Sequence, residues 1–164
     1  MGPGNNNLLD DVMEEDQLIK FSKEIAKVKD NERLLVIVTH GFIELLLNVI
    51  IEAKCKRAKK IKDSRDYPQS VKLVLLNEIG LIDDNLFKVL DWFRRLRNKA
   101  AHEPFFALSD SERSYIDETL KSFPPGKAVG GLHRFCTYIV GVIWNPHRKI
   151  LTPAFMPSIA EENE

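Results

Sequence analysis

The sequence is poor in cysteine and has no excess of charge of either sign. Two cysteines, Cys55 and Cys136, occur among 164 residues, and their separation fits neither a disulfide framework nor a zinc site, so we expect two free, buried thiols. Twenty-four basic residues balance 24 acidic residues. A formal net charge of zero gives no support for nucleic-acid binding by the chain as a whole, so such binding would have to rest on a local site.

Several other patterns are missing. The N-terminal part has no basic segment followed by an apolar one, which is the pattern of a secretion signal, so we expect a cytoplasmic protein. No run alternates apolar and polar residues for long enough to form a sheet, and no internal repeat is found. A glycine-rich phosphate loop and spaced sets of metal ligands are absent too. We therefore predict no cofactor and no metal.

Apolar residues recur instead at the three- and four-residue spacing of helices, and a hydrophobic content of 44% is enough for the core of one domain. We predict an all-α, single-domain bundle of five to six helices. Residues 1–15 are expected to form a disordered leader, 16–147 the helical domain and 148–164 an extended or disordered tail. The expected helices cover residues 16–30, 31–60, 69–79, 83 to near 104, 109–122 and 132–144.

The longest apolar segment, residues 34–51, is interrupted by a line of polar residues. His40, Glu44 and Asn48 are spaced four apart, so they lie along one side of the expected helix. A carboxylate in the middle of a bilayer is strongly unfavourable, so we expect the centre of a helical bundle and no membrane span. His40 is expected to be a hydrogen-bonded core residue.

The helix expected from residue 83 carries a second polar line. Arg94, Asn98 and His102 are spaced four apart, and Arg97 lies on the opposite border of the apolar stripe. An isolated buried charge is strongly destabilising, so a partly buried ion pair of Glu44 with Arg97 or Arg94 would explain these residues without any chemistry. We predict that ion pair.

The segment Arg97-Asn98-Lys99-Ala100-Ala101-His102 resembles the Arg, polar residue, spacer, His signature of the HEPN superfamily. The segments 70–73, 80–82 and 106–112 follow in an order similar to the mannitol operon repressor family, so that the resemblance covers about residues 34–118. It implies a HEPN-like helical fold and a homodimer. The superfamily includes metal-independent RNases, in which two protomers bring their motifs together, and many binding or regulatory proteins.

Two functions follow from this resemblance. We favour a cytosolic helical regulatory or interaction protein of the mannitol operon repressor branch, connected with transcription regulation, that acts as a homodimer and contacts a protein partner. The chain has Pro104 where many HEPN nucleases carry Tyr two residues after the His, and His102 could equally serve as a cation on the free carbonyls at a helix C-terminus.

The alternative is a metal-independent endoribonuclease, a toxin or an RNA-processing enzyme, with RNA as its partner. Its site would consist of Arg97, Asn98 and His102. His102 would be a base with a pKa near neutral, Arg97 would stabilise the charge of the phosphorane, and Asn98 would orient the phosphate.

The segment 54–65 is a further candidate binding region, because its basic residues face only one acid, Asp63. Its cations either complement the negative C-terminal end of a solvated helix or form a phosphate-binding patch, and both interpretations stay open. Trp92 and Phe93 are expected to pack in the core, with a base-stacking platform as the alternative. The candidate binding residues are Glu44, Lys56, Arg57, Lys59, Lys60 and Arg94.

Overall fold

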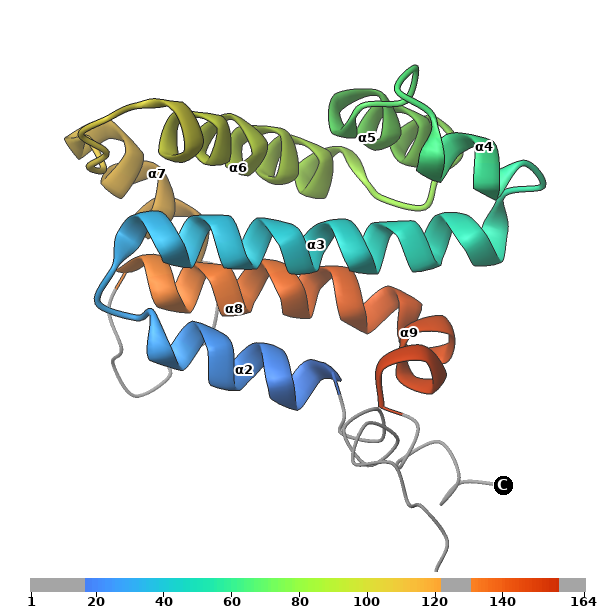
Figure 1. Cartoon of the computed structure of the whole chain (residues 1–164), viewed down its shortest axis with the longest axis horizontal. Helices are drawn as coiled ribbons and strands as arrows, with labels where there is room; N and C mark the ends of the chain where they lie inside the picture. The colour runs from blue at the N-terminus through green and yellow to red at the C-terminus, as the bar shows by residue number, and fades with distance from the viewer. Residues whose placement is uncertain (1–16, 122–130, 157–164) are drawn as a thin grey trace, which may run out of the picture.

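The computed structural model of the chain describes residues 17–121 and 131–156, and in this part of the chain every regular element is a helix (Figure 1). The all-α prediction is thus confirmed. The helices outnumber the expected five to six because of two short ones, α4 and α9. In chain order the elements are α2 (Gln17–Lys27), α3 (Glu32–Lys54), α4 (Ala58–Asp63), α5 (Gln69–Glu78), α6 (Asp84–His102), α7 (Asp110–Leu120), α8 (Gly131–Trp144), the 3-10 helix η1 (Asn145–His147) and α9 (Arg148–Phe155).

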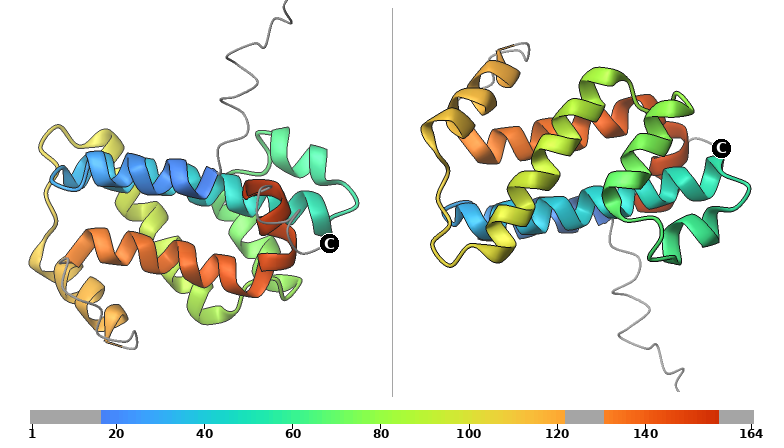
Figure 2. Two further views of the ribbon diagram at one scale, coloured as in Figure 1. Left: turned by 90° about the horizontal axis from the view of Figure 1, so that it is seen from below. Right: turned by 90° about the horizontal axis from the view of Figure 1, so that it is seen from above.

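The long helix α3 is the centre of the bundle. Figure 1 shows α5 and α6 on one side of it and α8 and α2 on the other, and Figure 2 shows α6 crossing over both α3 and α8. By length and composition α3 could cross a membrane, but 56% of its most apolar window is buried inside the fold. Leu46, Leu47 and Ile50 have no exposed surface. The contacts with its neighbours account for the apolar character of α3.

The helix expected over residues 31–60 is in fact two helices. Asn31 caps α3 by accepting a hydrogen bond from the N–H of Leu34 at 3.0 Å, but α3 ends at Lys54 because Cys55 is extended. The last residues of α3, 52–54, are exposed, Cys55 after them is only half-buried, and the chain turns back and buries Ile61 of α4 instead. Tertiary burial therefore overrides the continuous helical pattern here.

The connection from α5 to α6 is a tight turn that depends on Gly80 and Asp83. Gly80 has a φ of +72°, a region that favours glycine, and the N–H of Leu81 donates to Leu76 O at 2.9 Å. Asp83 then accepts a hydrogen bond from the N–H of Leu86 at 2.8 Å and so caps α6. Local signals fix the ends of both helices.

The extended or disordered tail expected over residues 148–164 is wrong for its first part, because residues 148–155 form α9. Leu151 is fully buried, and the ring of Phe155 packs edge-on against Phe42 of α3 at 5.7 Å between centroids. This burial holds the helix even though Pro153 lies inside it. The expected leader, residues 1–15, lies outside the described residues, as do residues 157–164.

Two smaller expectations concern aromatic and sulfur side chains. Phe93 is fully buried, and Trp92 is half-buried and stacked on Tyr115 at 4.3 Å, so core packing describes both better than a base-stacking platform. Both cysteines are free, but only Cys136 is buried, and burial raises the pKa of its thiol to about 12. Cys55 is only half-buried, because it is the residue at which α3 ends.

Candidate functional site

A polar pocket forms where α3, α5 and α6 meet, and it has a volume of about 190 Å³. Three of the expected site residues, Arg94, Arg97 and Asn98, line it from α6, and Glu44 lines it from α3. The start of α5 supplies the remaining side of the pocket. The sequence alone gave no indication that this segment lies beside the other residues. The polar pocket is lined by His40, Glu44, Pro68, Gln69, Ser70, Arg94, Arg97 and Asn98.

His40 is the most buried of these residues, with 5% of its surface exposed. Its Nδ1 lies 3.8 Å from Glu44 Oε2, while its buried Nε2 has no hydrogen-bond partner, which corrects the expectation of a hydrogen-bonded core histidine. Burial, together with the nearby charges of Arg97 and Arg94, lowers the pKa of His40 to about 4. At neutral pH its imidazole is therefore uncharged.

The predicted ion pair of Glu44 with Arg97 or Arg94 is wrong. Arg94 instead donates to Asp91, one helical turn earlier, with Nη2 at 2.8 Å and Nε at 3.1 Å from Oδ1. Such a local pair needs less ordering of side chains than a pair between helices. The Glu44 side chain is 44% exposed and so remains hydrated without a guanidinium partner.

Arg97 has no acidic partner within the part of the chain that the structure describes. Its Nη1 donates to the amide oxygen of its neighbour Asn98 at 3.4 Å. This arrangement leaves the guanidinium group free to bind a ligand at the polar pocket.

His102 does not join the other two residues of the motif. It is the last residue of α6, it is exposed, and it lies outside the polar pocket that Arg97 and Asn98 line. A single chain therefore does not assemble Arg97, Asn98 and His102 around one cavity.

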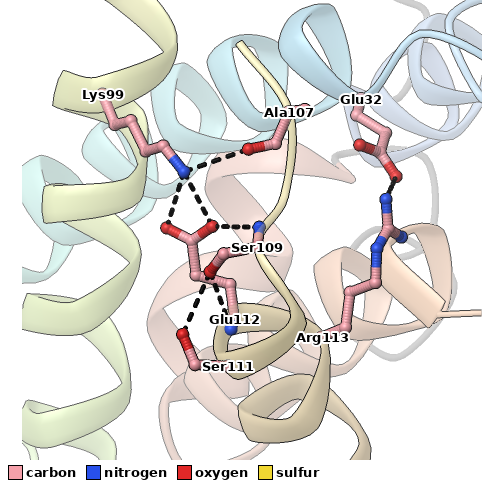
Figure 3. Close-up of polar contacts among 7 residues, drawn as sticks. All are labelled: Glu32, Lys99, Ala107, Ser109, Ser111, Glu112 and Arg113. Atoms are coloured by element: carbon pink, nitrogen blue, oxygen red, sulfur yellow. Dashed lines mark hydrogen bonds and ion pairs between the residues drawn. The ribbon is translucent and has the colours of Figure 1, made fainter.

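Lys99, in the middle of the motif, has a structural role that sequence reasoning missed. Its Nζ lies 2.8 Å from Glu112 Oε2 and donates to Ala107 O at 3.0 Å (Figure 3). Glu112 also accepts from the N–H of Ser109 at 2.7 Å, and Ser109 Oγ accepts from the N–H of Glu112, so the two form a capping box. The ion pair thus ties α6 to the start of α7.

The charge of Glu112 is stabilised by the same contacts. Burial by itself would raise the pKa of this carboxyl, but the hydrogen bonds from Lys99 and Ser109 outweigh it and lower the pKa of Glu112. Arg113 adds a second tie, since its Nη2 lies 3.0 Å from Glu32 Oε1 at the start of α3 (Figure 3). Ion pairs therefore tie the start of α7 both to α6 and to the start of α3.

The loop between α6 and α7 presents an aromatic side chain to solvent. Arg33 Nη2 donates to the carbonyls of Glu103 at 2.6 Å and Pro104 at 2.9 Å, and Lys99 Nζ lies 5.6 Å from the ring centroid of Phe106. Between these anchored residues, Phe105 is 94% exposed. The sequence shows Phe105 and Phe106 as equivalent apolar residues and gives no signal for this difference.

The basic segment is separate from the polar pocket. Its candidate residues lie at the α3–α4 connection and on α4, are exposed, and do not line the pocket; they are Lys56, Arg57, Lys59 and Lys60. Lys62, in the same segment, pairs with Glu52 of α3 at 2.9 Å. These exposed positions fit a solvated helix end.

Among the residues that the structure describes, no group of three or more His, Cys, Asp or Glu side chains is placed to hold a metal ion. Comparisons of the chain with protein-family models, with curated proteins and with solved structures find no match. The HEPN resemblance therefore stays a prediction that rests on the sequence motif alone.

Proposed function

We propose that this chain is a cytosolic helical regulatory or interaction protein, of the mannitol operon repressor type, that acts as a homodimer and binds a protein partner. The observation that carries the proposal is Phe105, a 94% exposed aromatic side chain on a loop whose neighbouring carbonyls are fixed by Arg33. Leu34, the residue after Arg33, is 43% exposed. We assign the dimer contact to this surface, defined by Leu34 and Phe105.

The fixed loop favours binding for an entropic reason. Ordering a mobile loop on association costs free energy, and a loop that is already held by Arg33 and Lys99 avoids most of that cost. Buried aromatic side chains are among the commonest energetic centres of protein interfaces. Phe105 therefore combines a large apolar side chain with a preset position.

Light scattering of the purified protein tests the dimer. At a concentration on the order of 50 μM the wild type should have the mass of a dimer, if the Kd is about 1 μM. Phe105→Ser should be monomeric with an unchanged circular dichroism spectrum. Ile79→Ser, which changes a 48% exposed residue at the end of α5, is the matched control and should remain dimeric. A monomeric wild type, or a dimeric Phe105→Ser variant, would contradict the proposal.

A metal-independent endoribonuclease is the second candidate function, and one observation favours it. His102 is exposed at the end of α6, so a second chain could place its own His102 near Arg97 and Asn98. The wild type should then cleave RNA in the presence of chelator and leave 2′,3′-cyclic phosphate ends. His102→Ala should lose that cleavage and stay folded. If the wild type does not cleave RNA, this candidate is excluded.

A further inference from the structure

The polar pocket has more donors than the protein itself uses. Two guanidinium groups and one carboxylate are its charged groups, and one of the guanidinium groups, on Arg94, is already bonded to Asp91. The Arg97 guanidinium has only the neutral Asn98 amide as a partner in the described ranges. A planar group with several N–H donors is suited to bind the oxygens of a carboxylate or phosphate.

The start of α5 adds donors from a second direction. Its N-cap is Pro68, which has no side chain able to accept a hydrogen bond, and its first turn contains no acidic residue. The N–H groups of Val71 and Lys72 donate to Pro68 O, so those of Gln69 and Ser70 are the donors at the helix start. Both residues line the polar pocket, where the positive end of the helix dipole favours an anion.

His40 is the independent sign that the pocket takes a ligand. It lies on the α3 side of the pocket, is 5% exposed, and has a buried Nε2 without a hydrogen-bond partner. Leaving a buried polar atom unsatisfied costs about 1–3 kcal/mol, so such atoms are rare in folded proteins. Nε2 itself is closed even to water. Nδ1 lies 3.8 Å from Glu44 Oε2 in the same pocket, beyond hydrogen-bond distance, so a bound group with oxygen atoms would give this second ring nitrogen a partner.

We propose that the polar pocket binds a phosphoryl group in its protonated, monoanionic form, either inorganic phosphate or the end of a small phosphomonoester. Donors or acceptors approach from three helices, which fits a tetrahedral group better than a planar carboxylate. A volume of about 190 Å³ holds one such group, and it is below the roughly 300 Å³ at which pockets for larger ligands begin.

Glu44 determines the protonation state of the ligand. Its carboxylate lines the pocket and can only accept hydrogen bonds, so it repels a fully ionised anion and pairs with one that carries a P–OH group. Phosphomonoesters have a second pKa of about 6, so about half of the molecules carry this proton at pH 6 and roughly a tenth at pH 7. Sulfate has no proton to donate and should therefore bind more weakly than phosphate.

Isothermal titration calorimetry at constant ionic strength, with inorganic phosphate, methyl phosphate and sulfate as ligands, tests the proposal. At least one phosphate ligand should bind, and sulfate should bind about tenfold more weakly. Binding of inorganic phosphate alone would identify the free ion as the ligand, and binding of methyl phosphate alone would identify a phosphomonoester. Both results support the proposal.

Two variants of α6 separate the pocket from general charge attraction. Arg97→Gln should lower the affinity about tenfold or more. Arg95→Gln removes the same charge from the same helix, but its side chain is 65% exposed and does not line the pocket, so it should change the affinity by no more than about twofold. Circular dichroism checks that both variants are folded.

Ser70→Asp covers the case in which Arg97→Gln does not fold. A carboxylate at the start of α5 stabilises the helix while it repels an anion, so the variant should be at least as stable as the wild type and should not bind phosphate. Glu44→Gln should remove the preference for phosphate over sulfate. A wild type that binds no phosphate ligand, equal affinity for sulfate, or equal losses in Arg97→Gln and Arg95→Gln would overturn the proposal. The pocket lies within one chain, so monomeric Phe105→Ser should bind phosphate normally and the dimer proposal is tested separately.

Discussion

At the scale of single residues, His40 shows how a buried titratable group links pH to stability. Its pKa is about 4 in the folded protein, against an ordinary value of 6.5, because of burial and the charges of Arg97 and Arg94. Between these two pH values the unfolded chain binds a proton that the folded chain does not. The stability that depends on neutral His40 is therefore complete above about pH 6.5 and decreases as the pH falls towards 4.

Replacing His40 tests this link. Between pH 7 and pH 4.5 in phosphate-free buffer, the free energy of unfolding of the wild type should fall by about 2 kcal/mol more than that of His40→Leu. At pH 7 the variant should be at least as stable as the wild type, because it removes the unpartnered Nε2. Urea unfolding at several pH values measures both effects. Parallel curves for the two proteins would show that His40 is not the group responsible.

Site residues were harder to predict from sequence than their helices. The four-residue spacing of Arg94 and Asn98 correctly placed both beside the apolar stripe of α6. The spacing of residues in the sequence does not show which of several carboxylates a guanidinium group will pair with, and Arg94 pairs with Asp91 and not with Glu44. It also gave no sign that the start of α5 would close the pocket, since that contact depends on how three helices pack.

At the scale of elements, the Lys99–Glu112 pair joins two helices through one partly buried contact. Its side chains are only 25% and 19% exposed, so each charge depends on the other for compensation. The capping box adds the hydrogen bond from the N–H of Ser109 to the same carboxylate. Because the Lys99–Glu112 pair links two helices and is shielded from water, it should stabilise the fold more than the exposed pairs on α7 do.

Glu112→Gln should lower the free energy of unfolding by about 2 kcal/mol, because it leaves the Lys99 ammonium partly buried without a counter-charge. Glu118→Gln is the matched control on α7, and it should change stability by less than about 0.5 kcal/mol since Glu118 and its partner Lys121 are both exposed. Thermal or urea unfolding at pH 7 measures the difference. Equal effects of the two variants would contradict the role given to Glu112.

The pH dependence of this element has the opposite origin to that of His40 but the same direction. The pKa of Glu112 is lowered in the folded protein, so its contribution to stability is complete above the ordinary pKa of a glutamate, about 4.5, and is lost as the pH falls through the folded value.

Helix ends that carry local signals were predictable from the sequence: Asp83 caps α6, and Ser109 with Glu112 starts α7. The break after Lys54 was not, because it is set by the burial of Ile61.

At the scale of the whole molecule, the last described helix completes the core. Leu151 of α9 is fully buried, in a region that composition had suggested would be an extended or disordered tail. Prolines at 153 and 157 and the acidic end led to that expectation, whereas the decisive factor is the apolar surface of α3 that the segment covers. Sequence patterns within one segment do not show what another segment leaves uncovered.

Leu151→Ala should therefore lower the free energy of unfolding by about 2–5 kcal/mol, the range for truncating a buried leucine side chain to alanine. Val71→Ala, which shortens a 40% exposed side chain on α5, is the control and should have an effect below about 1 kcal/mol. Urea unfolding of both variants provides the comparison. A neutral Leu151→Ala would show that α9 is not part of the cooperative core.

The central position of α3 has a consequence for folding during synthesis of the chain. The helices that cover it from below in Figure 1, α8 and α9, are translated last, whereas α3 itself is finished at Lys54. At a synthesis rate of about 5–20 residues per second, roughly 5–20 s pass before the segment that ends at Phe155 has been added. During that interval the long apolar helix α3 is incompletely covered on the ribosome, so the nascent chain should depend on chaperones that bind exposed hydrophobic segments.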